Sequence, residues 1–354
     1  MTLTEWRFVT DLKVGAGADD AEGLSQVKGL VVTQRGHIWV LEASTQDIRV
    51  FDSTGQRLRR IGRKGRGPGE LLWPDGMAPG PDGTIWVHDP QNGRFSLFSE
   101  SGDFLRQQMA PASGYAWVWT GGLDRTGRVW DQVFGNIEEG LPERLRRAPA
   151  DWSRVDTLEL PSCQPPGWKP EDAYYSKLLD GTRAARYSVT VPFYPVPVRA
   201  FEWATGAVWC APSGAEYRLI KLDIERHDTL ARITASALPV PVPPAERDSA
   251  VAALHKFLAN MGEPDADWTR IPSVKPVVVG ALVDDANRLW VRRGTVDTVS
   301  LFDIYSGAGQ PLATVRIPFA ISSWVAPVVR ADRVWVVALD QDGVPFIVRG
   351  RFGP

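Results

Sequence analysis

The sequence predicts an all-β protein, a six-bladed β-propeller built from four-stranded blades. A tryptophan motif recurs six times along the 354 residues. The 33 Gly and 28 Pro residues favour many short strands joined by tight turns. In addition, one strand at the N-terminus has no partner within its own repeat. We therefore treat residues 1–354 as a single domain.

Each copy of the motif has a turn residue, one further residue, an aliphatic residue and then tryptophan. The six tryptophans are Trp39, Trp86, Trp130, Trp209, Trp290 and Trp335. Successive copies are 47, 44, 79, 81 and 45 residues apart. Three of these spacings match a period of about 40–50 residues per propeller blade, and the two long ones leave room for insertions. We expect the six side chains to pack between blades and to take no part in chemistry.

The residues around each tryptophan supply the other strands of a blade. In the first repeat, a short apolar strand at 29–32 precedes the tryptophan, and strands at 48–51 and 58–61 follow it. Gly, Asn or Asp in the motif allows the positive φ that a tight hairpin needs. The last repeat ends at 346–352 without a fourth strand. We expect the strand at 6–14 to close that blade, which removes two exposed sheet edges.

Two insertions interrupt the repeat, at residues 161–198 and 238–276. The first is rich in Pro and aromatic residues, which predicts an extended loop and an edge-like segment. The second contains the one helix that the sequence predicts, with Pro before its first turn and Gly262 at its C-cap. Both insertions join a fourth strand to the next first strand, so we expect them on one face. Function usually lies on such loops.

Residues 62–105 resemble an NHL repeat. The likeness rests on Gly-Arg-Gly-Pro-Gly-Glu at 65–70, Pro-Asp-Gly at 74–76, the strand at 82–89 and Phe-Ser-Leu-Phe at 95–98. The chain as a whole is similar to the NHL-like bacterial six-bladed propellers. Many members of that group are exported or lipid-anchored, and most have no assigned activity. The resemblance implies a fold and an extracytoplasmic location, but no reaction.

Charge and hydropathy exclude two classes of partner. Lys and Arg number 40 against 42 Asp and Glu, a net charge of −2, so no global field attracts nucleic acid. No run of about 18 apolar residues is present, which excludes a membrane-spanning helix.

The first residues carry no export signal. The protein is therefore either cytoplasmic or, as the resemblance implies, extracytoplasmic with its signal removed.

The residue types expected at the mouth of the central channel argue against a metal centre. Lactonases of similar fold hold calcium there with several carboxylate and amide oxygens. Here Asp75 is the one acidic residue at the start of a first strand. A catalytic zinc needs three converging ligands, and of the four histidines only His88 can approach the mouth. We therefore expect no metal and no cofactor.

Two further patterns leave alternatives open. Glu42, Asp89, Asp131 and Asp340 follow tryptophan strands at similar offsets, so they either cap turns or form paired carboxylates at the mouth. Cys163 and Cys210 map to the same face. They form a disulfide in an oxidising compartment, or remain two buried thiols.

Binding is the function that the sequence favours over catalysis. Exposed tryptophan beside arginine suits a planar, glycan-like or peptide ligand. The tryptophans in or beside connections on the insertion face are Trp73, Trp117, Trp119, Trp168, Trp268 and Trp324. We expect a non-enzymatic module that binds a small molecule, glycan, peptide or protein partner through Trp73, Asp75, His88, Asp89, Arg199, Arg292 and Trp324. The alternative is a hydrolase or lyase with its active site at the channel mouth.

Overall fold

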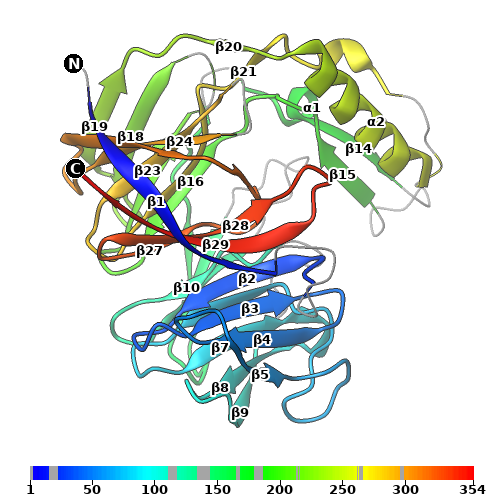
Figure 1. Ribbon diagram of the computed structural model, residues 1–354, viewed down its shortest axis with the longest axis vertical. Helices are drawn as coiled ribbons and strands as arrows, with labels where there is room; N and C mark the ends of the chain where they lie inside the picture. Colours follow the sequence, from blue (N-terminus) through cyan, green and yellow to red (C-terminus); the bar gives the residue numbers. More distant parts are fainter. Residues whose placement is uncertain are drawn as a thin grey trace.

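The structure is a computed structural model with an all-β architecture (Figure 1). It describes residues 3–15, 23–110, 118–133, 144–164, 168–178, 186–212, 214, 216–260, 262, 266–295 and 299–354. Over these ranges the strands are joined by tight turns, and the chain contains two α-helices. Many turn glycines have positive φ, as in the hairpins before Trp86 (Gly83, φ 80°) and Trp130 (Gly127, φ 78°).

Four separate antiparallel sheets each contain four strands that follow one another along the chain. The first two sheets consist of β2 (Val27–Val32), β3 (Ile38–Glu42), β4 (Asp47–Phe51) and β5 (Arg57–Ile61), then β6 (Gly76–Pro79), β7 (Ile85–Asp89), β8 (Arg94–Phe98) and β9 (Phe104–Met109). The third and fourth consist of β10 (Gly122–Leu123), β11 (Val129–Val133), β12 (Arg144–Ala148) and β13 (Asp156–Glu159), then β16 (Val198–Glu202), β17 (Ala207–Ala211), β18 (Tyr217–Asp223) and β19 (Thr229–Ala235). The first four copies of the tryptophan repeat thus correspond to separate four-stranded sheets.

A fifth sheet has nine strands. These are β22 (Val278–Val283), β23 (Leu289–Arg293), β24 (Ser300–Tyr305), β25 (Pro311–Ile317), β1 (Thr4–Val14), β29 (Pro345–Gly353), β28 (Arg333–Leu339), β26 (Ala320–Ile321) and β27 (Val328–Arg330). The expected pairing of the N-terminal strand with the last strand is present, because β1 runs antiparallel to β29. However, β1 has 11 residues, and its first three paired residues run parallel to β25. This extra pairing merges strands that the sequence places in two separate blades.

The six motif tryptophans lie in the core, as predicted. Trp39 of β3 shares a buried cluster with Val87 of β7 in the next sheet. Trp335 of β28 likewise packs with Val40 of β3. First strands of several neighbouring sheets also contact one another, in the order β27, β2, β6 and β10, and again between β16 and β22. The sheets therefore pack face to face, with their first strands innermost.

The two insertions contact each other and share a small core of their own. The first contains α1 (Pro170–Ala173), β14 (Tyr174–Leu178) and β15 (Arg186–Thr190), and the second contains β20 (Val240–Pro241), α2 (Pro244–Asn260) and β21 (Val274–Lys275). Leu254 and Leu258 of α2 pack with Tyr175 and Val191 of the first insertion. The predicted helix is thus present. The first insertion was expected to be an extended loop, whereas it forms a hairpin and a four-residue helix that lie near α2 (Figure 1).

Cys163 and Cys210 form a disulfide, with their Cα atoms 5.3 Å apart. Both cysteines are buried. The bond joins the beginning of the first insertion to the end of β17. Of the two alternatives left open by the sequence, the structure contains the disulfide.

Candidate functional site

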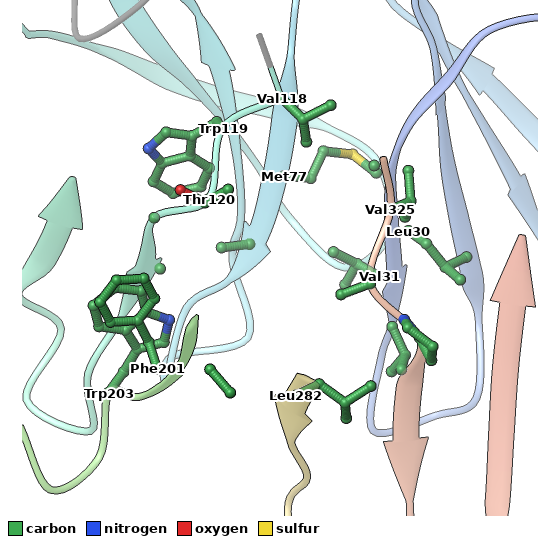
Figure 2. A pocket seen from close by; sticks show the side chains of 18 of the residues that line it. Leu30, Val31, Met77, Val118, Trp119, Thr120, Phe201, Trp203, Leu282 and Val325 are labelled. Atoms are coloured by element: carbon green, nitrogen blue, oxygen red, sulfur yellow. The ribbon is translucent and has the colours of Figure 1, made fainter. Parts of the chain in front are cut away.

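A cavity of about 680 Å³ lies between the first strands of the sheets (Figure 2). One wall is aliphatic and includes Leu30 and Val31 of β2 and Leu282 of β22. Across the cavity lie Trp119 and the stacked rings of Phe201 and Trp203, whose centroids are 4.4 Å apart. Most of the lining is therefore apolar, and it is supplied by several different sheets.

Contacts between neighbouring first strands show that their beginnings meet at one end of the cavity. A Cβ added to Gly29 of β2 would lie 3.3 Å from Met77 of β6. A Cβ added to Gly76, at the start of β6, would lie 2.7 Å from Cβ of Trp119. The two insertions lead into β16 and β22 at this end. We call it the insertion end, and the opposite end the far end.

The polar lining residues gather mainly at the insertion end. Lys28 and Arg199 lie near the beginnings of β2 and β16, and Thr120 precedes β10. The Thr120 hydroxyl donates to Oε1 of Gln132 at 2.7 Å. Arg330 lines the far end, where β27 finishes. The described residues of the lining include no carboxylate, so their formal charge is positive.

Burial affects two of these cations. It lowers the pKa of Lys28, and the Asp75 carboxylate opposes that shift. It also lowers the pKa of Arg330, with Asp285 and Glu100 acting in the opposite direction. Lys28 is thus a partly desolvated ammonium group beside the cavity.

Trp119 is held in place by buried polar residues that do not line the cavity. Its indole Nε1 donates to Oδ1 of Asp131 at 2.9 Å, and Asp131 forms an ion pair with Arg146. The Trp119 ring stacks on His88, with centroids 5.6 Å apart. His88 Nδ1 and Asp75 Oδ1 form a hydrogen bond of 2.6 Å, and both residues are 3% exposed. Burial raises the pKa of Asp75, and the hydrogen bond with His88 opposes that rise.

The cavity brings together only some of the residues that the sequence predicts for the site. Arg199 and Trp324 line it, and Trp324 is 57% exposed. Asp75 and His88 lie behind Trp119 and do not line it. Arg292, at the end of β23, is also outside the lining, and burial lowers its pKa.

Trp73 and Asp89 lie apart from the cavity lining. Trp73 is 53% exposed and has a φ of 57°. Asp89 is buried and accepts hydrogen bonds from the backbone N–H of Leu72 at 2.8 Å and from the Asn92 amide at 2.7 Å. Asp89 therefore holds the connection between two sheets. Burial raises its pKa, and these hydrogen bonds oppose the rise.

The other carboxylates that follow tryptophan strands also bond to turns or to neighbouring side chains. Glu42 accepts from the backbone N–H groups of Ser25 and Gln26, both at 2.9 Å, and from the hydroxyl of Ser44 at 2.6 Å. Asp340 accepts from the backbone N–H of Val344 at 2.8 Å. None of the four lines the cavity. Glu42, Asp89 and Asp340 bond to backbone N–H groups, as in the turn-capping alternative, whereas Asp131 bonds to the side chains of Trp119 and Arg146.

The remaining aromatic residues named from the sequence have varied positions. Trp119 is in the cavity wall, whereas Trp268 packs against the insertion core. The Trp168 indole donates to the carbonyl of Pro195 at 3.2 Å. Trp117 lies outside the described residues. Within the described ranges, no group of three His, Cys, Asp or Glu residues is arranged to hold a metal ion.

Sequence reasoning did not select Lys28, Thr120, Gln132 or Arg330. Lys28 occupies the same position in its repeat as Asp75 and Arg199 do in theirs, at the start of a first strand. A lysine or arginine at that position supplies no oxygen ligand for calcium, but it can place a cation at the cavity. The same position could have identified Lys28 as a cation at the cavity.

No protein-family model and no curated protein matches the sequence. Solved structures do resemble the chain. A member of the DUF4221 family from Bacteroides vulgatus is 12% identical, with a TM-score of 0.59 over 99% of both chains. The fold is a β-propeller.

Two other solved structures match nearly the whole chain, and they belong to different kinds of protein. A protein from Bacteroides fragilis that is described as a putative exported protein is 12% identical to this chain. The match covers 98% of this chain and 96% of that protein, with a TM-score of 0.52. A streptogramin B lyase is 10% identical over 98% of both chains, with a TM-score of 0.50. At these identities the likeness shows the β-propeller fold alone. No helix in the described part of this propeller is long and apolar enough to cross a membrane.

Proposed function

We propose that the chain is a non-enzymatic binding module, and that its ligand is a small molecule held in the central cavity at the insertion end. One observation carries this proposal: a cavity of about 680 Å³ is lined by apolar side chains with a few polar groups near one end. This size and this lining are typical of small-molecule sites. The exposed Trp324 and the more buried Trp119 provide flat surfaces at the entrance.

The proposed architecture is a six-bladed, NHL-like propeller. In it β22–β25 form the fifth blade, and β27, β28, β29 and β1 form the sixth. Support comes from the six buried tryptophans, which occupy β3, β7, β11, β17, β23 and β28. The antiparallel pairing of β1 with β29 also supports it. Arg94 bonds to the carbonyls of Gly67 and Glu70, both at 2.8 Å, so it orders the glycine-rich segment on which the NHL resemblance rests.

The cavity supports binding better than hydrolysis or elimination. General acid–base catalysis needs a titratable group within hydrogen-bond reach of the reacting atoms. The described lining residues include no His, Asp, Glu, Cys or Tyr, and their cationic groups are Lys28 and two arginines. A hydrolase or lyase is therefore the second candidate.

The proposed location is extracytoplasmic. The Cys163–Cys210 disulfide supports it, because such bonds persist in oxidising compartments. A protein of similar fold is described as exported, which agrees with this location.

The proposed site can be tested by filling it. Ala326 lines the cavity and is exposed, so Ala326→Phe places a ring in the space without opening the core. The probe is N-phenyl-1-naphthylamine, a neutral dye that fluoresces in apolar surroundings. We expect saturable binding to the full chain, loss of that binding in Ala326→Phe, and normal binding in the control Ala252→Phe on the exposed face of α2. Equal binding by both variants would place the dye elsewhere and reject the site.

A further inference from the structure

We propose that the buried Asp75–His88 pair is a positioning element of the proposed site: it fixes the orientation of the Trp119 ring and makes ligand binding depend on pH. This inference rests on the proposed function, because it describes how binding in that same cavity is regulated. Neither residue of the pair lines the cavity. The pair acts through Trp119, which does line it (Figure 2).

Hydrogen bonds link the three residues directly. His88 Nδ1 and Asp75 Oδ1 are 2.6 Å apart, and each of these two residues is 3% exposed. The backbone N–H of Asp75 donates to the carbonyl of His88 at 3.2 Å, and the backbone N–H of Trp119 donates to the carbonyl of Asp75 at 2.9 Å. The carboxyl group, the imidazole and the backbone of Trp119 therefore form one bonded unit.

Ring contacts extend this unit to the cavity wall. His88 stacks on Trp119, with ring centroids 5.6 Å apart. Phe95, which is completely buried, packs against both rings, at 4.9 Å from His88 and 5.2 Å from Trp119. The energy of such aromatic pairs depends on the offset and tilt of the rings. A change in the His88 ring therefore alters the packing of Trp119, whose ring borders the cavity.

Packing alone does not require an acid–base pair here. His88 lies two residues after the motif tryptophan of its repeat. In three other repeats this position holds a buried apolar residue, namely Leu41, Ala211 and Val337. Apolar side chains of similar volume often stabilise a fold as well as a buried ionic pair does. A role in the site therefore explains the pair better than packing does.

The strands around the pair carry the charged side chains Lys28 (β2), Asp89 (β7), Arg94 (β8), Asp131 (β11) and Arg146 (β12). Asp89 and Arg94 form an ion pair with each other, and so do Asp131 and Arg146. Lys28 and Asp131 act on the Asp75 carboxyl group in opposite directions. All five are unchanged in the variants below, so a difference between those variants and wild type comes from the pair.

The sign of the pH effect follows from the Asp75 carboxyl group. Burial raises its pKa above the ordinary value, although the hydrogen bond with His88 acts in the opposite direction. An ionised carboxylate forms a stronger hydrogen bond than a neutral carboxyl group. As the pH falls through the pKa of Asp75, the bond to His88 weakens and Trp119 is held less firmly. We therefore expect ligand affinity to fall in acid.

The first test measures binding of N-phenyl-1-naphthylamine to the full chain between about pH 8 and pH 4.5, a range over which this dye stays neutral. We expect wild-type affinity to fall about threefold or more toward acid, as when an aromatic contact is weakened. The double variant Asp75→Asn, His88→Gln keeps a donor and an acceptor but has no titratable group in the pair. Its affinity should not change with pH. The same pH dependence in both proteins would overturn the role of the pair.

Single variants separate the ring from the charge. His88→Gln removes the stacked ring and should weaken dye binding about threefold to tenfold near pH 7.5. Asp75→Asn keeps an acceptor for His88 but no longer titrates, so it should abolish the fall in affinity. The control is His255→Gln, because His255 is an exposed histidine on α2 outside the cavity lining. This control should have the affinity and the pH profile of wild type.

A signal from Trp119 itself tests positioning without a ligand. Protein that contains 5-fluorotryptophan is titrated by ¹⁹F NMR, and the Trp119 resonance is assigned by its loss in Trp119→Phe. We expect this resonance to shift with pH in wild type, with the same midpoint as dye affinity, and to stay constant in the double variant. A Trp119 resonance that is independent of pH in wild type would overturn the inference.

The outcomes distinguish this inference from the proposed function. Dye binding that is lost in Ala326→Phe but is independent of pH in wild type would overturn the inference and keep the cavity as the site. No dye binding in wild type would reject the proposed function and its regulation, and the ¹⁹F titration would then decide only whether the pair orients Trp119. If the double variant fails to fold, Asp75→Asn replaces it in both experiments.

Discussion

Arg349 Nε lies 2.6 Å from Asp11 Oδ1, so an ion pair joins two residues that are 338 positions apart in the chain. Asp11 lies where the pairing of β1 with β29 shifts register, between Thr10 and Leu12. Such a bulge turns one side chain out of the regular ladder. Arg349 also donates from Nη1 to the carbonyl of Ser53 at 2.6 Å. One guanidinium therefore links the N-terminal strand, the last strand and a turn of the first sheet.

This linkage predicts a measurable contribution to stability. Arg349→Met keeps the apolar stem but leaves Asp11 and the Ser53 carbonyl without this donor. We expect the free energy of unfolding to fall by about 1–3 kcal/mol, as when a partly buried charged hydrogen bond is removed. Urea unfolding measures the change. The control is Arg351→Met, because Arg351 lies 3.6 Å from Asp11 and its side chain is 61% exposed. A loss of more than about 1 kcal/mol in the control would contradict the special role of Arg349.

The disulfide predicts sensitivity to reductant. It closes a loop with a sequence separation of 47, which corresponds to about 4 kcal/mol in the chain-entropy account. We therefore expect wild-type protein to unfold at lower urea concentration after reduction. The variant with Cys163→Ala and Cys210→Ala should unfold at the same urea concentration as the reduced wild type, with or without reductant. Finding two alkylatable thiols in the native, non-reduced protein would show that the bond is absent.

The framework was predictable because its signals are local. Gly83 precedes Trp86 in a hairpin, and the strand that contains Trp86, β7, is buried along its whole length. Such a pattern needs no knowledge of distant residues. The parallel pairing of Thr4–Trp6 with β25 was not predictable, because it depends on where a closed ring places its two ends.

The candidate site was only partly predictable for a related reason. The repeat places Asp75 and His88 at the ends of strands near the channel. Whether they face the cavity depends on Trp119, which precedes β10 of the next sheet and stacks on His88. The hydrogen bond from the Tyr175 hydroxyl to the carbonyl of Asp267, at 2.6 Å, similarly joins the two insertions through residues that are 92 positions apart. No spacing within either insertion indicates that contact.

The hydrogen bonds that Glu42 accepts predict that the protein loses stability in acid. Burial alone raises the pKa of its carboxyl group, but hydrogen bonds from Ser44, Ser25 and Gln26 outweigh burial and lower that pKa in the folded protein. A lowered folded-state pKa stabilises the protein above the unfolded value of about 4.3, and this stability is lost as pH falls through the folded value. Glu42→Gln should therefore lower the free energy of unfolding by about 1–3 kcal/mol at pH 7 and have less effect below pH 4.

Unfolding of Glu42→Gln and wild type across pH 3–7 measures this difference. Glu5→Gln, which changes an exposed glutamate on β1, is the control and should not alter the pH profile. A difference between wild type and Glu42→Gln that stays constant down to pH 3 would contradict the ionised state of Glu42 as its cause.

The tryptophan motif itself contains a hydrogen bond that can be measured. Trp290 Nε1 donates to Oδ2 of Asp284 at 2.8 Å, and Arg288 Nε donates to the same oxygen at 2.6 Å. The arrangement recurs where Trp130 donates to Asp124 at 3.1 Å. In a double-mutant cycle of Trp290→Phe and Asp284→Ala, we expect a coupling energy of about 1–3 kcal/mol, because both groups are buried and the acceptor is charged.

Trp39 provides the matched comparison for that cycle. Its ring is as buried as that of Trp290, but its indole N–H has no acceptor among the described residues. Trp39→Phe therefore removes volume without breaking a hydrogen bond, whereas Trp290→Phe removes volume and leaves Asp284 with one donor fewer. Trp290→Phe should be the more destabilising change in urea unfolding. If the two substitutions are equally destabilising, packing alone explains why tryptophan occupies the second strand of each repeat.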